Sequence, residues 1–598
     1  MNKYSLDLIA LIIVAVALVL AITSVWNDTP IVDEIPHIGA GYSYVAKLDH
    51  RLNPEHPPLA KDLAGLSLKI YGINDGPAFE SRFWQKDING QWEFGRKLIF
   101  NSGNDPMRVS RFAKMPMLIF FIISAIIVFA WARQISGYFA ASMALFLFAL
   151  SPTVLAHARF VTTDVPALFG VLLSSYFFIH YLKNKNKKNL AAAGIAFGIA
   201  ELTKFSLFLL VPFFLALSII YALLNFKEKK ILHTTYYILH TILIIVIGYV
   251  FVVWPVYVLH TWNYPPELQH QHTENMLSTY GTRSIAETVI YLSDKPIIRG
   301  LAEYGLGLLM VTQRSVGGNT TYFMGEIRNW AWPQYFPIVY FIKEPLSFWL
   351  LLTIAFLYFG AKIKITNYKL QITKIRDWSR NNFEKLFMLA WILLYWFVSI
   401  RSNLNIGVRH LMPVYGFTFI LLAGVLVKIT TLINSKKILT TYYLLLTTLF
   451  GWYLYENLSV YPYYLTYFNQ VAGGPSGGYR YVVDSNLDWG QDLKRLTDWV
   501  ENPPAGGNIN KISLDYFGWS DQTYFLKEKL VWISSGKYKN ANEFLLDNPD
   551  GGYIAVSASF YMGSFEKPET SYAWLENYKP VTVIGNSIFV WYISPLLR

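Results

Sequence analysis

Long apolar stretches alternate with short polar ones along most of residues 1–460. A transmembrane helix needs about 20 consecutive, mainly apolar residues, and stretches of that length predict about eleven spans. The stretches start near Leu6, Ala113, Tyr138, Val165, Leu190, Phe205, Leu232, Gln334, Lys385, Val408 and Leu439. The pattern therefore predicts a polytopic α-helical membrane protein.

The first apolar stretch, residues 6–22, could also be a signal peptide that is cleaved off. However, no small-x-small cleavage site precedes the acidic residues at 33–34, and the stretch approaches the length of a span. We therefore expect it to be a retained first helix.

Three longer polar segments interrupt the pattern, at residues 27–112, 260–332 and 461–598. The first contains two amphipathic stretches, 35–48 and 57–71, which suit helices at a membrane surface. The last alternates helical patterns (491–500 and 541–546) with strand-like runs (511–516, 552–557 and 581–592). We therefore predict a transmembrane domain over 1–460, with outer loops at 27–112 and 260–332, and a small extracytoplasmic α/β domain over 461–598.

Composition and charge placement support this organisation. The chain is 54% hydrophobic and only 15% charged, with a mean hydropathy of +0.31, whereas soluble proteins are about a quarter charged. The net charge of +12 could suggest nucleic acid, but much of it lies in short clusters between spans, as at 183–188, 227–230 and 435–437. With the N-terminus inside, these clusters all face the cytoplasm, as the positive-inside bias requires.

An odd number of spans then places the C-terminal domain outside. We expect a multi-pass protein of the cytoplasmic (inner) membrane that has the lipid bilayer as a partner and binds no nucleic acid. The chain has no cysteine, which excludes disulfides and CxxC zinc sites.

The acidic pair Asp33-Glu34 comes directly after the first span. Carboxylates at a membrane interface cost desolvation free energy unless they are solvated or paired, so they often mark a functional site. In a partly dry cleft, burial can raise the pKa of a carboxyl toward that of a general base. The alternative is that Asp33 caps a helix and Glu34 is solvated.

Two more outer segments carry candidate chemistry. Glu55-His56 precedes a Pro-Pro pair, which holds both side chains in a defined turn for a metal, for a substrate, or for no partner at all. Arg159 and Asp164 lie in the short hairpin between two spans. Asp164 could serve only the start of a helix, but that role does not explain Arg159 beside it.

Cations recur at the predicted outer ends of later spans, where charges usually face a cavity or a partner. These cations are Lys204, Lys343, Arg401, Arg409 and His410. Snorkelling explains Lys204 equally well, and Lys343 could pair with Glu344. Arg409 and His410 precede a predicted helix, where the dipole disfavours cations and an anion such as phosphate would compensate.

Several nucleotide and calcium motifs are absent. Residues 484–488 start like an EF-hand loop, but Trp489 and Arg495 occupy the positions that require Gly and Glu. No Walker loop or dinucleotide fingerprint occurs either, which argues against nucleotide-driven chemistry.

Taken in order, these segments resemble the bacterial C-type-fold glycosyltransferases akin to protein O-mannosyltransferases (family 39) and the aminoarabinose transferase of lipid A. The resemblance covers nearly the whole chain and rests on short motifs. They are Asp33-Glu34, residues 56–59 (HPPL), 162–166 (TTDVP), 202–206 (LTKFS), 335–337 with 343–345 (YFP and KEP), 407–413 (GVRHLMP) and 467–491.

The resemblance implies a sugar donor on polyprenyl phosphate and a protein, lipid or glycan acceptor outside the membrane. It makes Asp33 the general base of an inverting transfer, while Glu34 and Asp164 shape the site or bind sugar hydroxyls. Arg409, with His410 or Lys343, would neutralise the leaving phosphate. The chain lacks the middle-loop β-trefoil domain of eukaryotic protein O-mannosyltransferases, so the acceptor cannot be carried over.

Two alternatives stay open. One is a lipid or solute transporter or flippase without chemistry, although transporters place charges near the membrane midplane in repeated halves, which this chain lacks. The other is an oligosaccharide-transferring enzyme of the same fold, which would require a divalent metal as cofactor. The sequence leaves that metal open and names no ligands for it.

Overall fold

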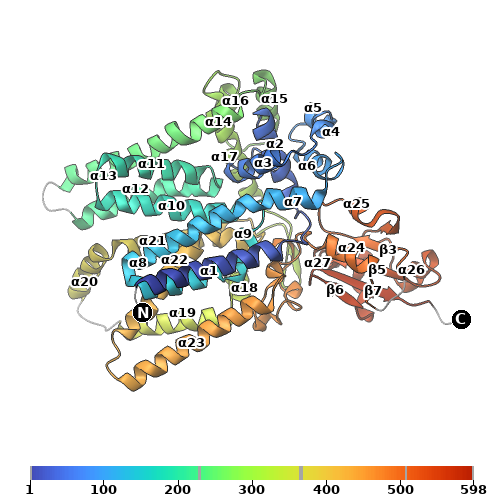
Figure 1. The fold of residues 1–598 in the computed structure, drawn as a ribbon. Coiled ribbons are helices and arrows are strands. Elements are labelled where there is room, and N and C mark those ends of the chain that lie inside the picture. The colour runs from blue at the N-terminus through green and yellow to red at the C-terminus, as the bar shows by residue number, and fades with distance from the viewer. Residues whose placement is uncertain (1–2, 226–229, 363–367, 505–507, 596–598) are drawn as a thin grey trace.

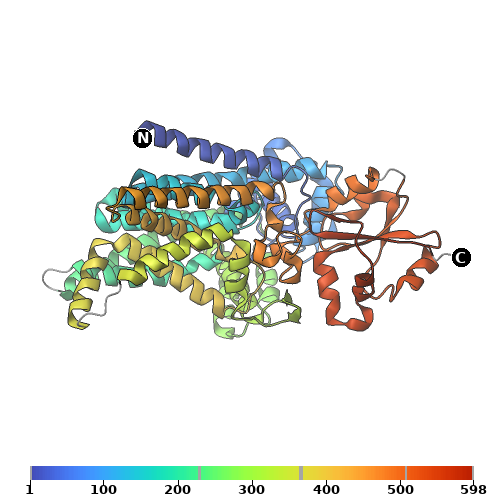
Figure 2. The same cartoon turned by 90° about the horizontal axis from the view of Figure 1, so that it is seen from below.

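The computed structural model describes the whole chain except residues 1–2, 226–229, 363–367, 505–507 and 596–598. A bundle of long helices forms the larger part, and a small sheet domain extends beyond one end of it (Figures 1 and 2). The long helices of the bundle are α1 (Lys3–Ser24), α8 (Leu118–Ala149), α10 (Asp164–Lys183), α11 (Lys187–Glu201), α12 (Leu210–Asn225), α13 (Lys230–Gly248), α19 (Leu346–Lys362), α21 (Phe383–Arg401), α22 (Met412–Thr430) and α23 (Lys436–Ser459).

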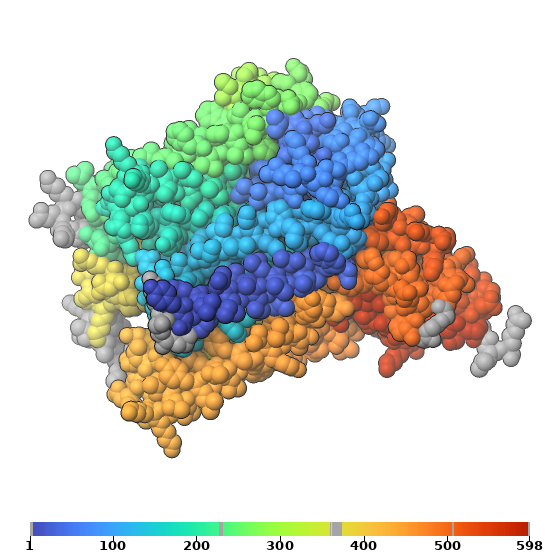
Figure 3. All heavy atoms as spheres, in the orientation of Figure 1, coloured from blue at the N-terminus to red at the C-terminus, as the bar shows by residue number. Residues whose placement is uncertain are grey.

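Seven helices of the described residues are long and apolar enough to cross a membrane, or up to eight if one bent pair counts as a span. Apolar residues of α1 such as Leu8 and Leu11 are exposed, and the helix lies along the outside of the bundle (Figure 3). Lipid would cover such a face. The polytopic helical class is thus confirmed.

The apolar stretches that start near Ala113 and Tyr138 lie in the segment Pro106–Ala149, as two helices on either side of a kink. It breaks at Gly137, whose φ of 84° is not helical. Two further expected spans, α11 with 15 residues and α23 with 24, lie in the bundle but are not among the seven. The total of about eleven spans stays a prediction.

The span expected from Gln334 is bent rather than straight. The chain bends by 112° between α18 (Tyr335–Lys343) and α19. Glu344 is extended there, with φ −110° and ψ 145°, because Pro345 disfavours helical geometry in the residue before it and offers no N–H. The bend leaves Lys343 at a helix end beside the C-terminal part of the chain.

The two loops at 27–112 and 260–332 fold into short helices at the end of the bundle nearer the sheet domain (Figure 1). The first loop forms α2 (Glu34–Lys47), α3 (Leu59–Tyr71), α4 (Gly76–Phe79), α5 (Arg82–Gln85), α6 (Gln91–Phe100) and α7 (Pro106–Lys114), and α9 (Pro152–Ala158) lies in the hairpin. The second loop forms α14 (Trp254–His260), α15 (Pro266–Met276), α16 (Arg283–Leu292), α17 (Arg299–Gly317), β1 (Thr321–Phe323) and β2 (Glu326–Arg328).

The two amphipathic stretches of the first loop are helical as expected, but α2 is not a surface helix. Its residues from Glu34 to Tyr44 are all buried, because α3 and α6 pack on it through glycines. A Cβ on Gly65 would lie 2.1 Å from the carbonyl oxygen of Gly41, and one on Gly95 would lie 2.1 Å from that of Ile35. Close backbone packing therefore fixes the helix that follows Asp33.

The C-terminal domain contains a five-stranded sheet in the order β4-β3-β5-β7-β6. Strands β3 (Ile512–Asp515), β4 (Leu530–Trp532) and β5 (Gly552–Ser557) run parallel, whereas β7 (Ile588–Ile593) is antiparallel to β5 and β6 (Thr582–Ile584). The strand-like run over 581–592 is β as expected, but Gly585 and Asn586, both with positive φ, divide it into a hairpin. Helices α24 (Leu493–Glu501), α25 (Gln522–Leu526), α26 (Ala541–Asp547) and α27 (Ala558–Gly563) complete the domain.

The segment that joins the bundle to this sheet, residues 461–492, contacts both parts. Asn469 donates its backbone N–H to Ile342 O, and Gln491 O accepts the N–H of Thr29. The domain boundary at 461 stays a prediction, since this segment packs on the bundle before the sheet begins.

Candidate active site

Four charged side chains from distant parts of the sequence meet at the end of the bundle that faces the sheet domain. Arg409 Nη1 lies 2.9 Å from Asp33 Oδ2 and 3.3 Å from Asp164 Oδ2. Lys204 Nζ lies 2.6 Å from Asp164 Oδ1. We call these four residues the arginine cluster.

Helix ends bring these side chains together. Asp164 is the first residue of α10, Lys204 precedes η2 (Phe205–Leu209), and Arg409 lies in η4 (Val408–Leu411) directly before α22. A cation at a helix N-terminus is unfavourable by itself, and the two carboxylates compensate it. Neither Asp33 nor Asp164 caps its helix through its side chain, so capping does not explain either acid.

The C-terminal part of the chain completes the environment of Arg409. The indole of Trp489 lies 4.2 Å from the guanidinium carbon, within range of a cation–π contact. Arg409 Nε donates to Ser485 Oγ at 3.2 Å. Residues 461–492, which we call the connecting segment, therefore contact the guanidinium through two side chains.

Glu34 is placed differently from its neighbour. It is fully buried, with Lys114 Nζ 3.2 Å away, and its two oxygens accept the backbone N–H groups of Val161 and Ile31 at 2.9 and 3.0 Å. Burial raises the pKa of the Glu34 carboxyl. Glu34 therefore joins the first loop to the hairpin, whereas Asp33 remains 24% exposed.

Glu55 and His56 line the same side of the first loop. Glu55 Oε1 accepts from Gln91 at 2.7 Å, and its other oxygen is buried with no partner in the described chain. The rings of His56 and His37 meet edge to face at 5.0 Å. Burial lowers the pKa of both histidines, so both imidazoles are neutral at neutral pH.

Lys61, which the sequence analysis missed, organises this loop. Its buried ammonium donates to four oxygens, namely Tyr44 OH, Asn53 O, Asn53 Oδ1 and His56 O, at 2.7–2.9 Å. Burial lowers the pKa of Lys61 to about 7. The only signal in the sequence is a lysine on an amphipathic helix, which normally indicates a solvated face.

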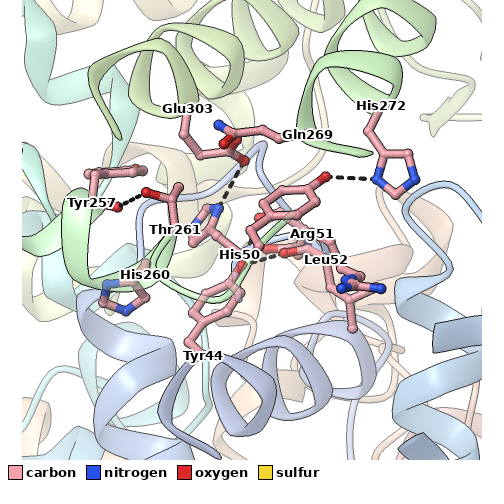
Figure 4. A network of polar contacts seen from close by, with 12 residues as sticks. Tyr44, His50, Arg51, Leu52, Tyr257, His260, Thr261, Gln269, His272 and Glu303 are labelled. Carbon is pink, nitrogen blue, oxygen red and sulfur yellow. Dashed lines mark hydrogen bonds and ion pairs between the residues drawn. The ribbon is translucent and has the colours of Figure 1, made fainter. Parts of the chain in front are cut away.

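A second network that the sequence did not predict connects the first loop to α17. The ring of His50 points toward Glu303 of α17, with Nδ1 3.1 Å from Oε1, and Gln269 donates to the other oxygen at 2.8 Å (Figure 4). Burial raises the pKa of Glu303 to about 8 and lowers that of His50 well below its usual value. The network is therefore a neutral hydrogen-bonded one that connects the first and second outer loops.

Arg159 lies outside the arginine cluster. It pairs with Asp28 at 2.7 Å, and Asp28 also pairs with Arg495 of α24 at 2.6 Å. Arg495 in turn contacts Asp492 at 2.5 Å. These four residues, which we call the seam network, join the hairpin and the end of α1 to the C-terminal domain.

Lys343 and His410 also differ from the cluster residues. Lys343 donates to the carbonyls of Leu465 and Asn486, both at 2.8 Å, and forms no ion pair with Glu344. Its role is to hold the connecting segment. His410 follows Arg409, and its Nε2 is buried without a partner in the described chain.

Two further charged residues were missed beside the cluster, Arg314 and Asp484. Arg314 lies on the same face of α17 as Gly307, two turns earlier, which packs against Pro54 and Phe205. Its guanidinium is exposed and has no ion pair among the described residues. Asp484 is the first of residues 484–488, which start like an EF-hand loop but lack its Gly and Glu.

The residues present offer no clear metal site. Among the residues that the structure describes, no three His, Asp or Glu side chains are placed to hold an ion together. The accessible acid of the cluster, Asp33, already has a cationic partner. We therefore derive no step through a metal.

Comparison with known proteins agrees with this architecture. Residues 11–265 match the model of the family described as dolichyl-phosphate-mannose-protein mannosyltransferase. No curated protein sequence matches the chain significantly.

Two solved structures resemble the fold over nearly the whole chain. The oligosaccharyltransferase AglB of Archaeoglobus fulgidus, in complex with an inhibitory peptide and dolichol-phosphate, is 13% identical, with 97% of this chain and 72% of that chain covered and a TM-score of 0.50. ArnT of Cupriavidus metallidurans bound to undecaprenyl phosphate is 12% identical, with 97% of each chain covered and a TM-score of 0.44. Residues 11–265 therefore match a family of glycosyltransferases, and the chain has the fold of the membrane-embedded C-type glycosyltransferases.

Proposed function

We propose that the protein transfers a sugar from a polyprenyl-phosphate donor to an acceptor hydroxyl of a protein, lipid or glycan on the outer side of the cytoplasmic membrane. The observation that carries the proposal is the arginine cluster, in which a lipid-facing bundle presents two carboxylates and two cations at one end. The matched family is named for a dolichyl-phosphate sugar, and AglB has been seen with dolichol-phosphate.

The orientation is part of the proposal. The basic helix α20 (Tyr368–Asn381) lies at the end of the bundle opposite the sheet (Figure 1). If that end faces the cytoplasm, as the positive-inside bias favours, the arginine cluster and the C-terminal domain are outside. A donor carried on a membrane lipid can reach a site at that depth without a nucleotide sugar.

In the proposed reaction Asp33 is the general base. A donor phosphate that approaches Arg409 competes with Asp33 for the guanidinium, and this competition frees a carboxylate oxygen. Asp33 takes the proton of the acceptor hydroxyl while the hydroxyl oxygen bonds to the anomeric carbon. The bond from that carbon to the phosphate oxygen breaks, its electron pair stays on the phosphate, and the configuration inverts.

The remaining site residues bind or position. Arg409 and Lys204 stabilise the charge of the leaving phosphate, with Arg314 and His410 at the edge of the site. Asp164 holds both cations in place, and Glu34 fixes the chain after Asp33. Glu55 and His56 face the acceptor side, while Arg159 and Lys343 hold the surrounding segments.

The test uses membranes that contain the protein and a panel of undecaprenyl-phosphate sugars carrying mannose, glucose or 4-amino-arabinose. We expect transfer from at least one of them, and loss of at least about 100-fold in the Asp33→Asn variant, since general-base catalysis contributes about that much or more. Asp105→Asn, which changes a carboxylate that caps α7, is the control. Near-normal transfer by Asp33→Asn with unchanged expression would contradict the assignment of the base.

Mass spectrometry of glycolipids and glycoproteins from cells with and without the gene then identifies the product. A glycan that disappears with the gene names both the sugar and the class of acceptor. Vesicle uptake of a solute that remains chemically unchanged would instead favour a transporter.

A further inference from the structure

Asp484 lies beside the arginine cluster, in the segment that joins the bundle to the sheet domain. Its φ of 55° is in the left-handed region, which Asn, Asp and Gly adopt more readily than other residues. Its backbone N–H donates to Ser559 Oγ of α27 at 3.0 Å. The residue is therefore held in a defined position by the C-terminal domain.

The carboxylate of Asp484 is only partly engaged. Its Oδ1 accepts the N–H of Ser485 at 2.5 Å, and the hydroxyl of Ser485 accepts from Arg409 Nε. In the part of the chain that the structure describes, Oδ2 accepts no hydrogen bond and the carboxylate forms no ion pair. The side chain is half-buried.

Burial of the Asp484 carboxyl favours proton uptake near neutral pH. Burial raises the pKa of its carboxyl to about 6; the nearby Asp33 carboxylate also raises it, and Arg409 and Arg314 lower it less than burial raises it. Asp488, in the same segment, is a further nearby carboxyl. A general base works best when its pKa lies near the working pH.

The other two acids beside Arg409 are each in direct contact with a cation. Asp33 is 2.9 Å from Arg409, and Asp164 contacts both Arg409 and Lys204. Asp484 is the carboxylate of the three that has no direct cation among the described residues.

We propose that Asp484 is a second proton-accepting residue of the transfer reaction, acting beside Asp33. This inference rests on the proposed function. Asp33 takes the proton of the acceptor hydroxyl while the hydroxyl oxygen bonds to the anomeric carbon, and Asp33 then passes this proton to Asp484 Oδ2. The bond to the phosphate oxygen breaks with its electron pair on the phosphate, and the proton later leaves Asp484 to solvent.

The test measures kcat and KM against pH for the wild-type protein and for Asp484→Asn, with the undecaprenyl-phosphate sugar that the wild-type protein uses. Asn keeps the left-handed backbone and the bond from Ser485, but it cannot take a proton. We expect kcat to fall by at least about 100-fold with KM nearly unchanged. We also expect the loss of activity near pH 6 in the wild-type protein to disappear from the profile of the residual activity. Asp484→Glu should recover part of the rate.

Asp488→Asn is the matched control. It changes a buried carboxyl of the same segment whose oxygen accepts from Ser559 at 2.9 Å, and burial raises its pKa to about 8, so Asn resembles the protonated form. It should leave the profile unchanged. Asp484→Gly, which tolerates positive φ, separates loss of the carboxylate from backbone strain and should behave like Asp484→Asn.

An Asp484→Asn variant with a wild-type rate and profile would overturn the inference, as would a defect confined to KM. Failure of the proposed function is a different result, because then the wild-type protein transfers no sugar from any donor of the panel. Equal thermal unfolding of the variants in detergent shows that a rate change is not a folding defect.

Discussion

At the scale of single residues, the role of a charged side chain depends on its partners more than on its residue type. Asp33 and Glu34 are adjacent, yet one meets Arg409 at the edge of the site and the other is sealed behind backbone N–H groups and Lys114. Removing one partner of a buried ion pair leaves an uncompensated charge, which costs about 3–5 kcal/mol. Substitutions of Glu34 therefore test folding first and chemistry second.

Glu303 gives the stability of the protein a pH dependence. Its pKa is raised by burial from 4.5 to about 8, so the folded protein keeps a proton that the unfolded chain releases as the pH rises. The contribution of this proton to the free energy of unfolding is complete below the pKa of Glu303 in the unfolded chain, and it is lost as the pH rises toward 8. We expect the midpoint of thermal unfolding to fall between about pH 5 and 8 in the wild-type protein, and to fall less in Glu303→Gln.

Thermal unfolding in detergent, followed by intrinsic fluorescence at several pH values, measures this difference. Glu287→Gln on the neighbouring helix α16 is the control, because Glu287 is 63% exposed. If the unfolding midpoint changed with pH by the same amount in the wild-type protein and in Glu303→Gln, the raised pKa of Glu303 would be contradicted.

At the scale of elements, glycines decide how closely the helices of the first outer loop pack. A methyl group on Gly65 would lie 2.1 Å from the carbonyl oxygen of Gly41 on the facing helix. The oxygen belongs to the backbone of α2, and the Cβ would be bonded directly to the backbone of α3, so neither atom can rotate away and the two helices must move apart. Because α2 begins at Glu34, directly after Asp33, this displacement reaches the arginine cluster.

We therefore expect Gly65→Ala to reduce stability by about 1–3 kcal/mol, the usual cost of overpacking, and to lower transfer activity. Gly451→Ala is the control, since a Cβ there meets no atom within 4 Å and the residue lies in α23. Detergent unfolding and the transfer assay measure the two effects. An unchanged unfolding midpoint in Gly65→Ala would show that the helices have room to separate.

At the scale of the whole molecule, the seam network joins the C-terminal domain to the bundle. Arg495 of α24 contacts Asp28 at the end of α1, and Asp28 also holds Arg159 of the hairpin. Two residues of the connecting segment, Ser485 and Trp489, contact Arg409 of the arginine cluster. The attachment of the sheet domain thus places residues of the connecting segment beside Arg409.

We expect Arg495→Met to loosen this attachment, because it leaves Asp28 and Asp492 with one cation fewer. Hydrogen exchange should become faster in residues 484–492 and at the end of α1, and transfer activity should fall. Lys494→Met is the matched control, since its pair with Asp498 is more exposed. Exchange that is equally slow in both variants would mean that other contacts hold the domain.

The sequence by itself determined the membrane class, the helical segments and the residue types of the site. Apolar length and charge placement are local properties, so they located the bundle, and strand-like alternation located β3 and β5. The resemblance to C-type glycosyltransferases, carried by ordered short motifs, named Asp33, Asp164, Lys204 and Arg409 before any contact was known.

Only the tertiary structure decided which of these charges meet. Lys61, Glu303, Arg314 and Asp484 were missed because their surroundings come from segments far away in the chain, which no local pattern reports. Arg159 and Lys343 were expected at the site, but nearby carboxylates or carbonyls engage them elsewhere. A pKa and an ion pair depend on burial and on distances of a few ångströms, and folding alone sets both.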